Sequence, residues 1–151
     1  MRDIKFRVWC KDKKIMCDVN DIYEGLYEPD KLEIDIYNVE IGYQDYHLTR
    51  ELDNIELMQY TGLKDNSNKE IYEDDIIRLW THKDEENPEN DKYEDYLVYW
   101  NDGAFVVNWE NEYSCCDLGY AINCWEADST EYKDWQVIGN KFNNPELLEE
   151  K

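Results

Sequence analysis

The stretch LMQYTGLKDNSNKEIYEDDII, residues 57–77, decides the fold of this chain. An apolar segment runs from Leu57 to the bend at Thr61-Gly62, a polar loop follows at 64–69, and aliphatic residues return from Ile71. Asn and Asp in such a loop hydrogen-bond their own backbone and tolerate left-handed geometry. The pattern therefore predicts a strand, a tight turn and a second strand that starts a small β-barrel.

Segments on both sides of this stretch alternate apolar and polar residues, as half-buried strands do. One turn signal is strong, because the Gly of Asp102-Gly103 supplies the positive φ that a tight hairpin needs. A polar run with Pro88 in its middle predicts an exposed loop over 83–95. The other predicted elements are a hairpin over 3–18, strands within 31–43, a strand at 75–81, a hairpin over 96–109, a weaker strand pair over 116–124, a strand at 135–140 and a short helix from Asn144.

These elements predict a mainly β protein, all-β or α+β. We expect an antiparallel small barrel or sandwich, SH3-like in its C-terminal half, with short helical segments. With 151 residues the chain is expected to form a single domain. Within it we expect an N-terminal hairpin and sheet over 1–56, a barrel-like core over 57–143 and a short C-terminal helix or tail over 144–151.

Negative charge dominates the composition. The chain has 37 Asp and Glu residues against 16 Lys and Arg residues, a formal net charge of −21. Such a surface repels nucleic acid and anionic lipid and favours basic partners. The acid-rich run over 83–95 is the candidate partner surface; the plainer alternative is a solvated loop. The candidate partner-binding residues are Asp84, Glu85, Glu86, Glu89, Asp91, Glu94, Asp95 and Tyr96.

Cysteines offer one candidate metal site. The N-terminus lacks the apolar core of a secretory signal and no run reaches membrane-spanning length, so a cytosolic protein with reduced thiols is expected. Cys10 and Cys17 flank the first hairpin, and Cys116 and Cys124 flank a later segment. Four such thiolates predict a structural zinc site. The spacings are long for zinc ligands, so separate buried thiols are an equal alternative, and Cys115 or a histidine could replace Cys116.

Three stretches resemble the YopX-like family of phage and prophage proteins. IKFRVW at 4–9 resembles the family's opening, 57–77 its most recognisable motif, and VIGN at 137–140 with NPELL at 144–148 its closing segment. The resemblance implies a small, mostly β protein acting in the cytosol of a bacterial host. It implies no catalytic or cofactor residue.

Two residues depart from the pattern of that family. Asp74 stands where the family usually has glycine, and Asp is among the less costly replacements if φ is positive there. Cys10 stands where the family usually has an acid. A cysteine that the common fold does not require favours the zinc hypothesis.

Acidic charge in a phage setting predicts a non-enzymatic inhibitor. The expected partner is a basic host protein such as a guide-RNA nuclease, whose positively charged channel must accept DNA. The chain would block DNA loading, an anti-CRISPR activity, either by imitating DNA or by docking away from the channel, and would bind neither nucleic acid nor membrane. No catalytic constellation or phosphate loop is visible at local spacing. The alternatives are a phage structural or assembly protein, with homo-oligomers left open, and a metal-dependent hydrolase.

Overall fold

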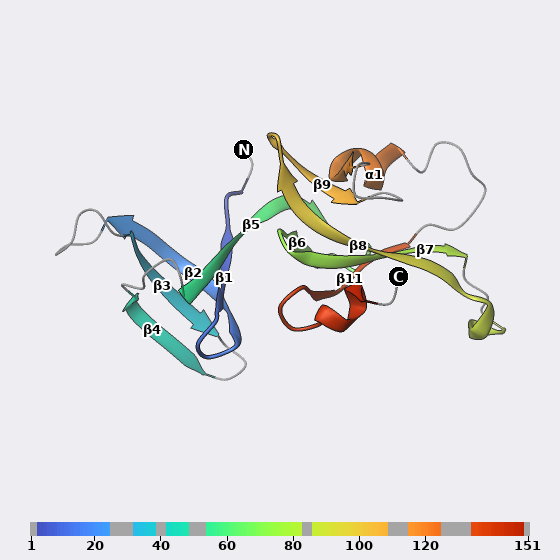
Figure 1. Ribbon diagram of the computed structural model, residues 1–151. Helices are drawn as coiled ribbons and strands as arrows, with labels where there is room; N and C mark the ends of the chain where they lie inside the picture. Colours follow the sequence, from blue (N-terminus) through green and yellow to red (C-terminus); the bar gives the residue numbers. More distant parts are fainter. Residues whose placement is uncertain are drawn as a thin grey trace. The chain divides into compact units, whose positions relative to one another are not determined.

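The computed structural model describes residues 3–24, 32–38, 42–48, 54–82, 86–108, 115–124 and 134–149. The chain divides into two compact units, Met1–Tyr60 and Thr61–Lys151 (Figure 1). Strand β5 (Ile55–Lys64) contributes residues to both units. The single domain expected from the sequence stays a prediction.

Antiparallel strands make up most of the described residues, which confirms the predicted fold class. The strands form two open sheets with the orders β4-β3-β2-β1-β5-β6 and β10-β9-β8-β7-β11, and neither closes into a barrel within the described residues. The elements before β5 are β1 (Phe6–Cys10), β2 (Ile15–Glu24), β3 (Leu32–Asn38) and β4 (Tyr43–Leu48). The elements after β5 are β6 (Glu70–Tyr72), β7 (Asp75–His82), η2 (Pro88–Asn90), β8 (Lys92–Asn101), β9 (Ala104–Asn108), β10 (Cys115–Asp117), α1 (Leu118–Cys124), β11 (Asp134–Asn140) and η4 (Pro145–Leu148).

One face of the first unit's sheet carries an apolar cluster. Strands β1 and β2 form the predicted hairpin, with Val8 opposite Cys17 and Cys10 opposite Ile15. Side chains that alternate along a strand point to opposite faces, so these four residues share one face. Its buried cluster consists of Val8, Cys10, Cys17, Ile34, Ile36 and Ile55.

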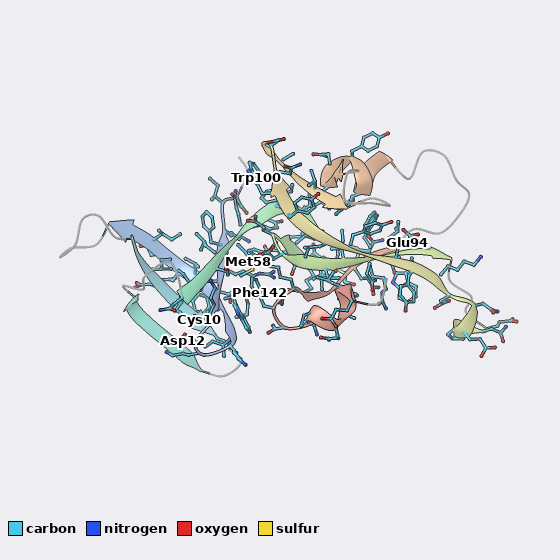
Figure 2. All side chains as sticks on the ribbon, in the orientation of Figure 1. Cys10, Asp12, Met58, Glu94, Trp100 and Phe142 are labelled. Carbon is cyan, nitrogen blue, oxygen red and sulfur yellow. The ribbon has the colours of Figure 1, made fainter. Side chains whose placement is uncertain are left out.

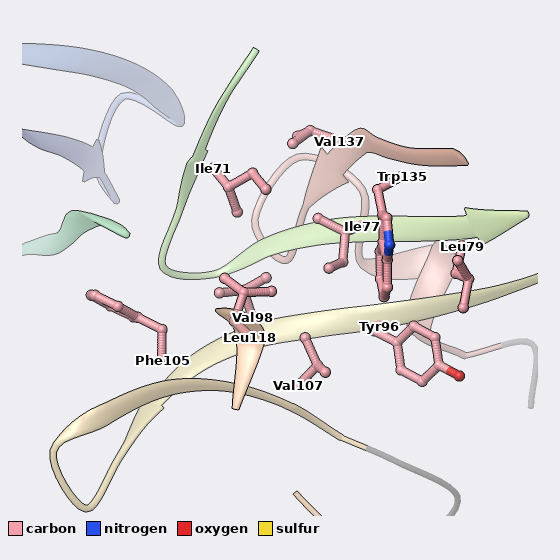
Figure 3. Close-up of a cluster of buried hydrophobic side chains, with 10 residues drawn as sticks. All are labelled: Ile71, Ile77, Leu79, Tyr96, Val98, Phe105, Val107, Leu118, Trp135 and Val137. Carbon is pink, nitrogen blue, oxygen red and sulfur yellow. The ribbon is translucent and has the colours of Figure 1, made fainter. Parts of the chain in front are cut away.

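The second unit has its own hydrophobic core, between the β7–β8–β9 and β11 strands and the helix α1 (Figure 3). Its buried side chains alternate along each strand, as a half-buried sheet requires. Two aromatic rings, Tyr96 and Trp135, lie 6.3 Å apart within it. The cluster consists of Ile71, Ile77, Leu79, Tyr96, Val98, Phe105, Val107, Leu118, Trp135 and Val137.

The hairpin predicted at Asp102-Gly103 is confirmed. Strands β8 and β9 meet there, and both turn residues have positive φ, +46° at Asp102 and +95° at Gly103. Positive φ at both central residues marks the turn whose twist matches that of the strands it joins.

Two local predictions were wrong. The segment expected as a strand pair over 116–124 contains the helix α1, because Asp117 Oδ1 accepts a hydrogen bond from Tyr120 N at 2.8 Å and so caps its first turn. Leu118 and Ile122 lie four residues apart on that helix and pack against the core, which holds it in place. The run expected as a loop over 83–95 contains η2, and β8 begins at Lys92, because its residues pair with β7 as far as His82.

Candidate functional site

The polar loop of the 57–77 stretch lies along one edge of β11. Asp65 Oδ2 accepts a hydrogen bond from Val137 N at 3.0 Å. Asn66 N donates to Trp135 O at 3.1 Å, and Asn66 Oδ1 accepts from Trp135 N at 3.3 Å. Lys69 Nζ donates to Val137 O at 3.4 Å. We call residues 65–69 the strap, because they bind an edge of β11 that has no strand beside it among the described residues.

Asp65 also builds the strap itself. Its Oδ1 accepts hydrogen bonds from Ser67 N at 2.9 Å and from Lys69 N at 2.8 Å. Asp65 is buried, and both of its carboxylate oxygens accept hydrogen bonds from within the protein. The turn-forming residues of the loop therefore have structural roles.

The acidic pair that follows the strap is structural as well. Asp74 has φ +65°, which confirms the positive φ considered for this departure from glycine. Its N–H donates to Val98 O at 2.8 Å, and its carboxylate lies 2.8 Å from Lys141 Nζ. Asp75 is buried, and its Oδ2 accepts from Tyr72 N at 2.8 Å. These carboxylates position the β6–β7 turn.

The side chain of Asn144 occupies the space that a side chain at Gly139 would take. A Cβ placed there would meet Asn144 Oδ1 and lie 2.8 Å from Asn144 Cγ. Asn140 Oδ1 holds the same turn by accepting hydrogen bonds from Phe142 N at 3.1 Å and Asn143 N at 2.9 Å. The motif residues at both ends of the second unit are thus accounted for by folding.

Part of the predicted partner surface is exposed. It lies at the end of the β7–β8 hairpin, where η2 leads into β8 (Figure 2). Glu86, Glu89 and Glu94 are exposed and Asp91 is half-buried, whereas Asp84 and Glu85 lie outside the described residues. We call Glu86, Glu89, Asp91 and Glu94 the acidic end.

Asp95 does not belong to the exposed acids. It binds Arg78, the residue opposite it on β7, through two hydrogen bonds, 2.6 Å from Nε to Oδ1 and 2.8 Å from Nη2 to Oδ2. These hydrogen bonds raise the pKa of Arg78 above its usual value. The guanidinium carbon lies 3.8 Å from the ring centroid of Tyr93, whose ring meets that of Trp80 edge-on at 5.1 Å.

This arginine–aromatic cluster was not predicted from the sequence. Arg78 and Trp80 alternate on β7, and Tyr93 and Asp95 alternate on β8, so the four share one face of the sheet. The alternation was visible in the sequence, but the pairing that brings the four together depends on strand register. The cluster fixes Tyr93, which stays 48% exposed beside the acidic end.

Tyr96, the last of the predicted partner-binding residues, lies in the core of the second unit. It is 2% exposed, and its hydroxyl donates a hydrogen bond to Glu94 Oε2. Its position follows from alternation, since Tyr96 pairs with Ile77 on the core face of the sheet. On β8 the exposed aromatic side chains are those of Tyr93 and Trp100, the latter labelled in Figure 2.

Each unit contains two of the four candidate zinc ligands. Cys10 and Cys17 are thiols buried in the apolar cluster of the first unit. Burial, followed by the neighbouring Cys10, raises the pKa of Cys17 to about 12. Cys116 lies in β10 and Cys124 ends α1, but their side chains are outside the described part of the chain. The zinc site stays a prediction that elemental analysis of protein purified without added metal would test.

Two negative findings apply to the described residues. Among them, no three His, Cys, Asp or Glu side chains come together as a group that could hold a metal ion. No helix in the described segments is long and apolar enough to span a membrane.

Charge is distributed unevenly between the units. The first unit has eight basic and 14 acidic residues, a formal net charge of −6. The second has eight basic and 23 acidic residues, a formal net charge of −15. Most of the negative charge therefore belongs to the unit that carries the acidic end.

Comparisons with known proteins agree on one family. The family model described as YopX protein matches residues 5–149. The solved structure of protein EF1440 from Enterococcus faecalis is 25% identical, with a TM-score of 0.57 over 98% of this chain and 99% of that one. The structure of protein yopX from Bacillus subtilis is 22% identical, with a TM-score of 0.55 over 98% and 99% of the two chains, and shows a shared fold. No curated protein matches the sequence.

Proposed function

Because the chain belongs to the YopX family, whose model matches residues 5–149, we propose that it is a non-enzymatic binding protein that inhibits a host nucleic-acid-dependent defence nuclease. The inhibition is of the anti-CRISPR type, in which DNA loading is blocked. The observation that carries the proposal is the concentration of charge: the second unit has a formal net charge of −15 and exposes Glu86, Glu89 and Glu94 at one end of a hairpin.

A guide-RNA nuclease is the partner class that this charge fits. Such a nuclease holds its heteroduplex and target DNA in a positively charged channel and recognises mainly their backbones. An acidic body competes with DNA for such a surface. Long-range attraction between opposite charges also speeds the encounter, in a salt-dependent way. The phage setting that the family resemblance implies supplies the reason for a phage protein to meet such a nuclease.

The use of polar residues in folding supports binding over catalysis. Asp65 is hydrogen-bonded to backbone N–H groups, Asp74 is paired with Lys141, and Asp95 is paired with Arg78. A general acid or base must instead reach the proton of a substrate. The carboxylates left exposed at the acidic end lie at the end of a hairpin, where charge can contact a partner.

Tyr93 gives the acidic end an anchor. Aromatic side chains contribute a large share of binding energy at protein interfaces. The ring of Tyr93 is half exposed and already contacts a guanidinium, that of Arg78, at 3.8 Å. An arginine of a basic partner would find the same chemistry on the exposed part of the ring.

The proposal is tested by binding to purified guide-RNA nucleases from bacteria that carry related prophages. The test variant is Glu86→Lys, Glu89→Lys and Asp91→Lys; it leaves Glu94 and Asp95 in place because they bind Tyr96 and Arg78. The matched control reverses three exposed acids elsewhere, Asp3→Lys, Glu146→Lys and Glu149→Lys.

We expect wild-type protein to bind at least one nuclease of such a panel, and to bind it less tightly as salt rises. The test variant should bind about tenfold or more weakly, since each surface charge contributes up to about 1 kcal/mol. The control should bind within about twofold of wild type. Equal weakening of both variants would reject the acidic end as the contact. If the chain binds no nuclease of the panel and associates only with itself, the result would favour an assembly protein.

A further inference from the structure

Between Trp135 and Val137, some backbone N–H and C=O groups of β11 point away from β7. All of these groups are hydrogen-bonded to the strap. The N–H and C=O of Trp135 bind Asn66, the N–H of Val137 binds Asp65, and its C=O binds Lys69. The side chains of Trp135 and Val137 point into the core (Figure 3). The strap thus satisfies the outer edge of β11 mainly with side chains, where a neighbouring strand would do so with its backbone.

In the part of the chain that the structure describes, β11 is the last strand of its sheet and lies next to β7. An uncovered edge strand presents a row of backbone donors and acceptors that pair readily with another chain. A loop laid over the edge prevents this pairing. We infer that the strap shields a strand-pairing site on β11, and that the partner it excludes is β11 of a second copy of this chain.

A second copy fits this edge for two reasons. In an antiparallel pair related by a two-fold axis, the donors and acceptors of Trp135 and Val137 meet identical groups in complementary order. The strand DWQVIGN also carries a single charge, Asp134, which is buried and accepts a hydrogen bond from Gln136 Nε2 at 3.1 Å. Repulsion between the two strands themselves is therefore small.

Charge on the rest of the chain opposes the same association. Two copies with a net charge of −21 repel each other at low salt. In about 1 M salt the screening length falls to about 3 Å, so contact between the edges is no longer penalised at long range. The inference is independent of the nuclease proposed above, because it concerns a different surface and a different partner.

The test variant combines Asp65→Asn with Asn66→Ala. If the amide oxygen introduced by Asp65→Asn keeps the loop bonds to Ser67 N and Lys69 N, the new amide N–H faces the N–H of Val137, donor against donor. The Asn66→Ala change removes the acceptor for Trp135 N. The control, Ser67→Ala with Asn68→Gly, truncates two side chains of the same loop, and glycine suits the positive φ of Asn68.

Two readouts decide the matter: amide hydrogen exchange at Trp135 and Val137 in low salt and at low protein concentration, where charge repulsion keeps the copies apart, and sedimentation velocity in 1 M NaCl over a range of protein concentrations. In the test variant we expect exchange at both amides to rise about fivefold or more, the effect of losing one hydrogen bond each. We also expect a concentration-dependent dimer, which a peptide DWQVIGN in excess dissociates. Wild type and control should stay monomeric.

Faster exchange at both amides without any dimer would overturn the inference, and so would unchanged exchange in the double variant. If the double variant does not fold, Asn66→Ala alone carries the test, since it leaves all three Asp65 hydrogen bonds in place. Fluorescently labelled DWQVIGN should then bind this variant and not wild type, and failure to bind a folded variant with fast exchange at Trp135 would reject the pairing site.

Discussion

The carboxylate of Asp65 accepts a hydrogen bond at 3.0 Å from the backbone N–H of Val137, 72 residues later in the chain. This contact joins the loop of the 57–77 stretch to the VIGN segment at 137–140. Two of the three stretches that resemble the family pattern therefore form one structural unit, in which the strap holds β11.

Asp65→Asn should destabilise the second unit by about 1–3 kcal/mol. The substitution keeps the shape of the side chain but gives an N–H in place of one acceptor oxygen, so one buried N–H loses its partner. Urea unfolding followed by tryptophan fluorescence measures the change. Ser67→Ala is the control and should shift stability by less than about 0.5 kcal/mol, because the Ser67 contact to Asp65 comes from its backbone N–H.

Gly139→Ala should lower the free energy of unfolding by about 1–3 kcal/mol, since the added methyl group would overlap Asn144. The double variant with Asn144→Ala removes the overlapping oxygen and Cγ. It should recover more than half of the loss, which thermal unfolding of the four proteins of this double-mutant cycle would show. Strictly additive effects would mean that the close approach of the two residues does not limit stability.

Arg78→Lys should destabilise the protein by about 1–3 kcal/mol, because lysine can neither make the two-point contact with Asp95 nor stack on Tyr93. The side chains of Arg78 and Asp95 are only 19% and 11% exposed. The comparison is Glu56→Gln, which breaks the pair of Lys11 and Glu56, whose side chains are 41% and 45% exposed.

The exposed Lys11–Glu56 pair should contribute less than about 1 kcal/mol. Chemical denaturation in low and in high salt separates the two cases. The loss of stability caused by Arg78→Lys should persist in high salt, whereas any loss of stability caused by Glu56→Gln should become smaller. Equal losses from the two substitutions would show that the Arg78 cluster adds no more stability than a surface ion pair.

Alkaline pH should destabilise the first unit through Cys17. Its pKa is about 12 in the folded state against an ordinary value of 9.0, so the folded protein keeps a proton that the unfolded chain loses. The stabilising contribution is complete below pH 9 and is lost as pH rises from 9 towards 12, by up to about 1.4 kcal/mol per pH unit.

Cys17→Val removes this titration while keeping an apolar side chain. The unfolding free energy of wild type minus that of Cys17→Val should be constant below pH 9 and should decrease as pH rises above 9. Parallel curves for the two proteins up to pH 11 would contradict the burial of a protonated thiol at this position.

Local signals in the sequence were enough to predict the hairpins. Asp102-Gly103 predicted its own turn, and the alternation around Val8 predicted the first hairpin, because both depend on neighbours in sequence. The helix at Leu118 was missed because a short apolar run around Gly119 reads equally as a strand, and its cap and core contacts lie outside any local pattern.

The site was harder to predict than the fold. Asp95 and Tyr96 were grouped with the exposed acids, but one pairs with Arg78 and the other faces the core. Which side of a strand is buried depends on its register with other strands, and a shift of one residue exchanges the two faces. The contact of Asp65 with Val137 is likewise set by tertiary packing alone.

The most direct measurement is target-DNA binding by a guide-loaded nuclease that this chain binds, titrated with wild-type protein and with the Glu86→Lys, Glu89→Lys, Asp91→Lys variant. We predict that wild type displaces the DNA in physiological salt, that higher salt weakens the displacement, and that the variant needs about tenfold more protein. DNA binding that stays unchanged at saturating wild-type protein would contradict inhibition by blocked DNA loading.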